Sequence, residues 1–177
     1  MYAAFGYILI DGEPMIKQID LRYTLCFLTR GDDVLMLHRQ NPPNRGLWNG
    51  VGGRLERDEA PVAGVLREVR EETGFLLETA RFAGVLTWDG YETPPGGLFI
   101  FTAEAPPGEP MVCNEGQLAW KPRGWVFSSP EVVSNIHVFG PLVLDGASPQ
   151  VYHFSYKDGQ IQAYSIDPLP EEWNTLA

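Results

Sequence analysis

Basic residues are scarce in this chain. Its 177 residues include 13 Lys and Arg against 23 Asp and Glu, which gives a formal net charge of −10 at pH 7. Proteins that bind long nucleic acids draw most of their affinity from Lys and Arg that neutralise phosphates. We therefore expect no long DNA or RNA partner, although a small polyphosphate could bind if divalent cations bridged it to the protein. An acidity that only keeps the protein soluble is the other interpretation.

Cysteines and long apolar runs are scarce as well. Cys26 and Cys113 lie far apart in the sequence, so they match neither a metal site nor a disulfide framework. Such cysteines are typical of reduced thiols in a cytosolic protein. No apolar run approaches the roughly 20 residues of a membrane span, and residues 1–10 lack the basic region and cleavage site of a secretory signal. We expect a cytoplasmic protein with no membrane partner.

The length favours one domain, residues 1–177, with a sizeable core. Residues 23–40 predict two strands joined by a turn at 30–33, and the segment 23–28 is apolar on both faces, as in a strand covered on both sides. Other expected elements are strands at 81–88, 97–105 and 117–122, a helical turn at 128–136, and a hairpin over 151–166 turning at Asp158-Gly159. Residues 1–20 form an N-terminal extension, either an extra hairpin or a stretch preceding an alternative start at Met15.

A helix is expected to begin near Pro61, which suits the first helical position, and to stop at Gly74, which suits a left-handed C-terminal cap. Four apolar residues recur at the i, i+3, i+4, i+7 spacing and predict its buried stripe: Val62, Val65, Leu66 and Val69.

The same helix carries three glutamates, Glu68, Glu71 and Glu72, that repel one another at spacings of three and four residues. At about 100° per residue they lie about 120° round from the buried stripe, so we expect all three at the rim of the domain. Mg²⁺ would reverse the repulsion, because it takes carboxylate oxygens and keeps positions for water and phosphate oxygens. Arg67 can orient one carboxylate by a bidentate hydrogen bond. A solvated acidic face with ordinary pairs such as Arg67–Glu71 is the alternative.

The spacing around these glutamates resembles a known family motif. Gly53 is followed after five residues by Glu59, then after seven by Arg67-Glu68, and then by Glu71-Glu72 and Gly74-Phe75. Over residues 53–75 the chain resembles the Nudix hydrolases at each fixed position of their box, which is far more specific than a lone glycine motif. The resemblance implies the α/β Nudix fold, a mixed β-sheet sandwiched between helices, here with additional β-hairpins.

The resemblance also implies a chemistry. Nudix enzymes hydrolyse a nucleoside diphosphate linked to a further group and use Mg²⁺, with Mn²⁺ as a substitute. The implied metal ligands are the Gly52 carbonyl and the carboxylates of Glu68, Glu71 and Glu72. By the same resemblance, Glu68 and Glu71 are catalytic together with Arg67, which orients them, while Gly53 and Glu59 are supporting residues. A bound cation neutralises the pyrophosphate, positions the attacking water and lowers its pKa.

A narrower similarity concerns the substrate. The segments 23–28, 46–56 and 151–166 resemble the MutT-like branch, which sanitises oxidised purine nucleotides (8-oxo-dGTP diphosphatases). By position, this implies that Asn49 and Asn135 contact the base, that Arg39 meets phosphates, and that Glu115 is a further ligand or base near the metals. An amide suits a purine edge because it offers both a donor and an acceptor. The alternatives are backbone satisfaction by Asn49, turn capping by Asn135 and a surface ion pair at Arg39.

We therefore expect a Mg²⁺-dependent pyrophosphohydrolase that converts a nucleoside triphosphate into the monophosphate and pyrophosphate, with an oxidised purine such as 8-oxo-dGTP preferred. Residues 128–140 lack the Trp and paired aspartates of the human-type enzyme, which leaves room for a broader specificity. The alternatives are another Nudix substrate (a dinucleoside polyphosphate, ADP-ribose or a 5′-triphosphate RNA end) and a non-catalytic domain that senses a nucleotide. The expected partner is a small nucleotide, and the sequence leaves open whether the chain is a monomer or a homodimer.

Overall fold

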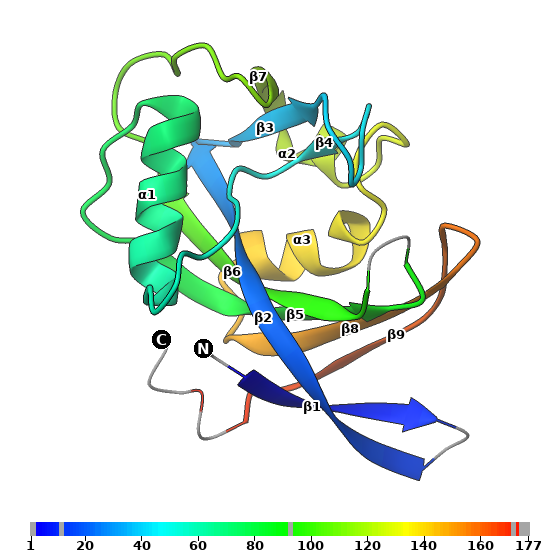
Figure 1. Cartoon of the computed structure of the whole chain (residues 1–177). Coiled ribbons are helices and arrows are strands. Elements are labelled where there is room, and N and C mark those ends of the chain that lie inside the picture. Colours follow the sequence, from blue (N-terminus) through cyan, green and yellow to red (C-terminus); the bar gives the residue numbers. More distant parts are fainter. Residues whose placement is uncertain (1–2, 11–12, 92–93, 171–172, 174–177) are drawn as a thin grey trace.

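The computed structural model describes residues 3–10, 13–91, 94–170 and 173 (Figure 1). In these residues the strands are β1 (Ala3–Ile10), β2 (Glu13–Arg30), β3 (Asp33–Arg39), β4 (Trp48–Asn49), β5 (Arg81–Asp89), β6 (Gly96–Glu104), β7 (Gly116–Pro122), β8 (Gln150–Lys157) and β9 (Gln160–Pro168). The helices are α1 (Pro61–Thr73), α2 (Arg123–Val126) and α3 (Ile136–Leu144).

The strands form one mixed sheet in the order β4-β3-β2-β6-β5-β8-β9, in which β1 also pairs with β2 and β7 with β3. The β2–β6 and β5–β8 pairs are parallel, whereas the other pairs are antiparallel. The long strand β2 changes partner along its length, since it pairs with β1 up to Asp20 and with β6 from Leu21 onward. This arrangement confirms the expected α/β class with a mixed sheet and additional hairpins.

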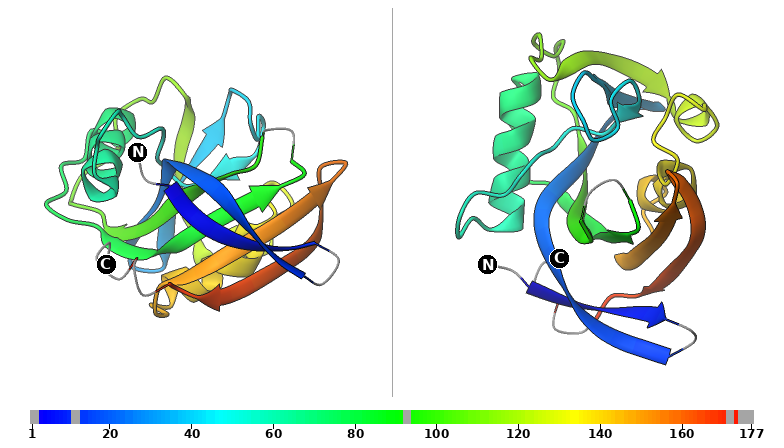
Figure 2. Two further views of the ribbon diagram at one scale, coloured as in Figure 1. Left: turned by 60° about the horizontal axis from the view of Figure 1, so that its bottom comes forward. Right: turned by 45° about the vertical axis from the view of Figure 1, so that its right-hand side comes forward.

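Helices cover the sheet on both sides. Figures 1 and 2 show α1 on one side of β2 and α3 on the other. The side chains of β2 alternate accordingly, because Leu25 and Phe27 belong to the core that contains Phe139 of α3, while Cys26 and Leu28 belong to the core that contains Val65 of α1. The expectation of a strand covered on both sides is confirmed, and a period of two explains why one strand can serve two cores.

Helix α1 begins at Pro61 and ends before Gly74, whose φ of 76° is left-handed, as the sequence predicted. The predicted stripe is correct for Val65 and Val69, which are fully buried, and wrong for Val62, which is 42% exposed. Gly64 explains the difference, because a Cβ there would lie 2.3 Å from the Leu55 side chain. The loop before the helix therefore packs against the Gly64 side of α1, and the helix turns that side inward.

The elements after α1 agree only in part with those predicted from the sequence. The strands β5, β6 and β7 and the hairpin of β8 and β9 are confirmed, and both turn residues of that hairpin have positive φ, 51° at Asp158 and 74° at Gly159. The helical turn expected over 128–136 is wrong in extent, because α2 precedes this segment and α3 begins only at its last residue. Of the two options for residues 1–20, the chain forms the hairpin, with residues 11–12 of its turn outside the described part.

None of the helices in the described part of the chain has the length and apolar character that crossing a membrane requires.

Candidate active site

The glycine-rich segment before α1 is held against the middle of β2. The Thr24 amide donates to the Gly53 carbonyl (2.8 Å), and Cys26 and Val51 exchange hydrogen bonds of 2.7 and 3.1 Å. A Cβ at Gly52 would lie 2.4 Å from the Thr24 carbonyl oxygen, and the φ of 138° is one that other residues rarely adopt. Only glycine fits this position, so the backbone of the segment can approach both β2 and α1.

Glu72 meets this segment from α1. It is only 4% exposed, and one carboxylate oxygen accepts a hydrogen bond from the Gly52 amide (2.8 Å). The other oxygen is buried and has no hydrogen-bond partner among the described residues. The pKa of Glu72 is raised to about 8, chiefly by burial and in part by the nearby charges of Glu115 and Glu68, while the hydrogen bond from Gly52 opposes the shift. The expectation of three glutamates at the rim is therefore wrong for Glu72, because α1 turns this edge toward the glycine segment.

The other two glutamates have different surroundings. The side chain of Glu68 is 14% exposed, and a Cβ at Gly53 would lie 2.4 Å from one of its carboxylate oxygens. Desolvation raises the pKa of Glu68, although its hydrogen bond with Arg67 opposes the shift. Glu71 is 60% exposed and lies 3.3 Å from Arg67. Gly53 therefore makes room for Glu68, and Glu71 is the one box glutamate that lies at the rim.

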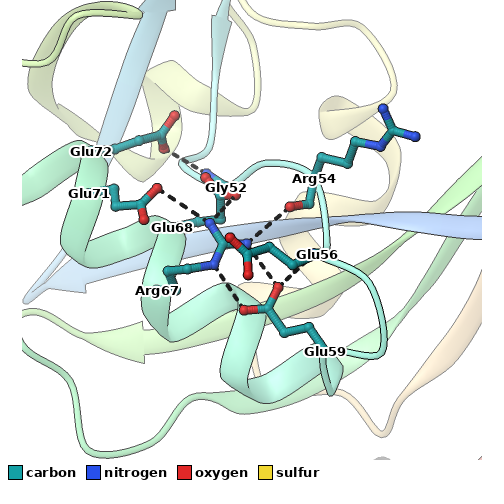
Figure 3. A network of polar contacts seen from close by, with 8 residues as sticks. All are labelled: Gly52, Arg54, Glu56, Glu59, Arg67, Glu68, Glu71 and Glu72. Carbon is teal, nitrogen blue, oxygen red and sulfur yellow. Dashed lines mark hydrogen bonds and ion pairs between the residues drawn. The ribbon is translucent and has the colours of Figure 1, made fainter. Parts of the chain in front are cut away.

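Arg67 connects the helix to the preceding loop (Figure 3). Its Nε and one terminal nitrogen donate to the two oxygens of Glu59, both at 2.9 Å. It also donates to Glu68 (2.8 Å), Glu71 (3.3 Å) and the Arg54 carbonyl (3.0 Å). The bidentate partner is thus Glu59, whereas Glu68 and Glu71 each receive one bond. The network lowers the pKa of Glu59 and raises that of Arg67, so both stay charged.

These donors suit a hard divalent cation. Carboxylate and carbonyl oxygens are the protein ligands that Mg²⁺ takes. Buried polar atoms normally have a hydrogen-bond or metal partner, and one oxygen of Glu72 is buried without a hydrogen-bond partner among the described residues. With the present side-chain positions, the described residues contain no group of three His, Cys, Asp or Glu arranged to hold an ion. Binding one there requires a carboxylate such as Glu71 or Glu115 to turn inward, or water and phosphate oxygens to complete the shell.

A cleft of about 820 Å³ opens beside the glycine segment. Gly53 lines it, and so do the five residues outside the box for which a role was predicted: Arg39, Asn49, Gly52, Glu115 and Asn135. The structure therefore brings the predicted substrate-binding residues together at one cleft, next to the backbone that contacts Glu68 and Glu72.

Arg39 and Glu115 face each other across the cleft wall. A terminal nitrogen of Arg39 lies 3.9 Å from a Glu115 oxygen, and the Arg39 Nε donates to the Pro43 carbonyl (3.0 Å). The Arg39 side chain is largely buried, whereas half of the Glu115 side chain is exposed. Two further arginines line the cleft, Arg22 and Arg54, and they were not predictable because isolated basic residues have no distinguishing sequence pattern.

The two asparagines present their amides differently. The side-chain oxygen of Asn49 accepts a hydrogen bond from the Gly50 amide (2.9 Å), which leaves its NH₂ group as a donor. Asn135 precedes α3, and its side chain makes no capping hydrogen bond to the start of that helix. The capping alternative for Asn135 is thus not what the chain adopts. Aromatic rings complete this part of the cleft: Trp88, Tyr91, Phe139 and Tyr156.

Comparison with known proteins identifies sequence relatives of this chain. The family model of the NUDIX domain matches residues 21–137. The chain is 29% identical over 153 residues to the uncharacterized Nudix hydrolase YvcI of Bacillus subtilis, covering 83% of this chain and 94% of that protein. It is 28% identical over 99 residues to the oxidized purine nucleoside triphosphate hydrolase of Mus musculus, covering 55% of this chain and 64% of that protein.

Among solved structures, the chain is similar to a MutT protein from Bacillus halodurans, with a TM-score of 0.71 and 30% sequence identity. The match covers 84% of this chain and 99% of that chain.

Proposed function

The chain belongs to the MutT-like Nudix hydrolases, which cleave phosphoric anhydride bonds, and we propose that it converts nucleoside triphosphates into the monophosphate and pyrophosphate. We propose an oxidised purine deoxynucleotide such as 8-oxo-dGTP as the preferred substrate. One observation carries the proposal: the backbone that contacts Glu68 and Glu72 lines the same cleft as the two asparagine amides. A triphosphate and its base could therefore be bound at once.

The proposed cofactor is Mg²⁺, with Mn²⁺ as a substitute. Its ligands would be the carboxylates of Glu68, Glu71 and Glu72 and the carbonyl of Gly52, and the buried unpaired oxygen of Glu72 supports this assignment. When bound, such an ion neutralises phosphate charge and makes water a better nucleophile.

The chain's own residues would hold the reacting groups in place. Arg67 is anchored by two bonds to Glu59, so its third bond keeps the Glu68 carboxylate beside Gly53. Arg39 supplies positive charge to the triphosphate from the wall of the cleft. Glu115 is half exposed, close to Arg39 and electrostatically coupled to Glu72, so we propose it as the base or as a further ligand.

Base recognition would rest on the two amides. In guanine, O6 and N7 both accept hydrogen bonds, but oxidation at C8 turns N7 into an N–H donor. Asn49 offers a donor, because its oxygen already accepts from the Gly50 amide, and the amide oxygen of Asn135 can offer an acceptor. One donor and one acceptor match the oxidised edge better than the unoxidised one. The similarity to the mouse oxidized purine nucleoside triphosphate hydrolase supports the same preference.

We further propose that residues 1–177 form a single Nudix domain, with the box at 53–75 and residues 1–20 as an extension. The strand β2 supports this, because it continues from the N-terminal hairpin directly into the central sheet. The two free cysteines support a cytoplasmic location.

A nucleotide panel with Mg²⁺ tests the proposed reaction. Pyrophosphate release from 8-oxo-dGTP, well above that from dGTP, is the expected result. Turnover only of ADP-ribose, a dinucleoside polyphosphate or a 5′-triphosphate RNA end would move the chain to another Nudix substrate. Tight nucleotide binding with no turnover would make it a sensor domain.

A further inference from the structure

Two segments from separate parts of the sheet meet at Tyr91 and Asn44. Tyr91 follows β5, Asn44 lies between β3 and β4, and both residues line the cleft. The strands β2 and β6 lie between β3 and β5 in the sheet. The Tyr91 hydroxyl nevertheless donates a hydrogen bond of 2.6 Å to the side-chain oxygen of Asn44. This bond therefore joins two regions of the chain that the sheet keeps apart.

The chain around Tyr91 is packed tightly against β8. The preceding residue, Gly90, has a φ of 66°, and a Cβ there would lie 2.0 Å from the Tyr156 carbonyl oxygen. Only glycine allows such a close approach of the two backbones. The Tyr91 ring also packs edge-on against the Tyr156 ring, with centroids 4.8 Å apart. The Tyr91 hydroxyl is thus presented to Asn44 from a fixed position.

On the other side, the bond is one peptide unit away from a contact of Arg39. The Arg39 Nε donates to the carbonyl of Pro43 (3.0 Å), which directly precedes Asn44. The Arg39 carbonyl accepts from the Gly46 amide (2.9 Å), so both its backbone and its side chain are held by the same loop. Because Nε is occupied, the terminal nitrogens of Arg39 are the groups left for Glu115, 3.9 Å away, and for a ligand in the cleft.

We propose that Tyr91 is a positioning residue for phosphate binding: by holding the Pro43-Asn44 peptide, it fixes the direction in which Arg39 presents its terminal nitrogens. This inference rests on the proposed function, in which Arg39 meets the triphosphate. A guanidinium binds phosphate through donors in a rigid planar arrangement, so its affinity depends on its orientation. Loss of the Tyr91 bond should therefore weaken phosphate binding and leave the chemistry at the box intact.

The variant Tyr91→Phe tests this, because it keeps the ring against Tyr156 and removes only the hydroxyl. We expect the KM for a nucleoside triphosphate and the inhibition constant of inorganic pyrophosphate both to rise about three- to tenfold, as for one lost hydrogen bond. The value of kcat should change much less. Formation of the nucleoside monophosphate is the readout. Since pyrophosphate carries no base, its weaker binding separates phosphate positioning from stacking of Tyr91 on a base.

Three further variants identify the route of the effect. Tyr164→Phe removes a hydroxyl from β9, where the side chain is 55% exposed, and should leave both constants unchanged. Asn44→Gly removes the acceptor, suits the backbone φ of 64° at this position and should reproduce the effect of Tyr91→Phe. In an Arg39→Met background, Tyr91→Phe should not weaken pyrophosphate inhibition further, because the residue through which it acts is gone.

The inference is overturned if Tyr91→Phe is inhibited by pyrophosphate as strongly as the wild type, or if the loss is the same with and without Arg39. Wild-type turnover that pyrophosphate does not inhibit would overturn it too. The proposed function survives each of these results, because the wild-type enzyme would still form the monophosphate. Wild-type protein that forms no monophosphate from any nucleoside triphosphate would overturn the proposed function itself, and this inference with it.

Discussion

Glu68, Glu71 and Glu72 carry the same functional group within five residues, yet the fold treats each of them differently. Glu72 is buried against Gly52, Glu68 is largely buried beside Gly53, and Glu71 is exposed. Burial of a carboxylate without a full set of partners is costly. A cation at this position would remove that cost for Glu72 more than for Glu71.

The first prediction therefore concerns Glu72→Gln. The amide oxygen can still accept from Gly52, so the fold should persist, but a neutral amide is a poor ligand for Mg²⁺. We expect Mg²⁺-dependent turnover to fall by about 100-fold or more, with unchanged circular dichroism. Glu104→Gln, at an exposed carboxylate at the end of β6, is the matched control and should behave as wild type. A Glu72→Gln enzyme with near wild-type turnover would refute the ligand role.

Gly53 is the second residue whose replacement has a defined geometric consequence. A methyl group there would lie 2.4 Å from a Glu68 oxygen, so Gly53→Ala should push this carboxylate out of place. We expect turnover to fall by about 10- to 100-fold, as for other residues that orient metal ligands. Gly124→Ala is the control, because a Cβ at Gly124 meets no described atom within 4 Å. Steady-state kinetics with both variants decide the matter, and equal rates would rule out steric displacement of Glu68.

At the scale of elements, helix α1 and the loop before it act as one unit. Arg67 joins them through its two bonds to Glu59, and Glu59 also accepts from the Glu56 amide (2.9 Å). The pKa of Glu59 is lowered, chiefly by Arg67, from its ordinary value of 4.5. The folded state therefore holds this carboxylate deprotonated more strongly than the unfolded chain does.

The lowered pKa of Glu59 fixes how its contribution to stability changes with pH. A lowered folded-state pKa contributes stability that is present above pH 4.5 and is lost as the pH falls through the lower folded value. We expect Glu59→Gln to lower the free energy of unfolding by about 1–2 kcal/mol at neutral pH, as for loss of a charge-assisted hydrogen-bonded pair. The difference from wild type should shrink in urea titrations below pH 4. A constant difference at all pH values would show that the effect is not electrostatic.

Local sequence patterns predicted helix α1 but not helix α3. α1 was predictable from Pro61, Gly74 and the spacing of Val65 and Val69, because each signal acts within a few residues. The helix α3 was missed, since it is almost wholly apolar, contains Pro141 and lacks the alternation of a surface helix. Its position over the sheet depends on packing against β-strands far away in the sequence.

At the scale of the whole molecule, an acidic chain encloses a cleft that we expect to bind an anion. The formal charge is −10, yet three arginines line the cleft: Arg22, Arg39 and Arg54. Carboxylates that bind cations, together with these arginines, would make the cleft locally attractive to phosphates. The overall acidity would still disfavour long nucleic acids.

We expect the melting temperature of the protein to depend on whether a cation is bound at Glu72. Its folded-state pKa is raised from 4.5 to about 8, so the folded state holds a proton that the unfolded chain releases. In metal-free protein, this group's contribution to stability is fully present below pH 4.5 and is lost as the pH rises to about 8. We expect Mg²⁺ to raise the melting temperature most above pH 8, where the carboxylate is already charged.

Melting curves with and without Mg²⁺ between pH 5 and pH 9 provide the measurement. In Glu72→Gln, both the alkaline loss of stability and most of the Mg²⁺ effect should disappear. A wild-type protein whose melting temperature responds to Mg²⁺ equally at pH 5 and pH 9 would contradict this link.

The sequence by itself predicted the helix of the box, because residues three to seven positions apart on a helix have a set geometry, and the spacing over residues 53–75 indicated the family to which the chain belongs. It also predicted that Asn49 and Asn135 contact one substrate, and the fold brings both to the same cleft. Only the tertiary structure decided that Glu72 is buried and that Glu59 is the bidentate partner of Arg67. These relations depend on strands and helices that are distant in the chain, and no local pattern encodes how such elements pack.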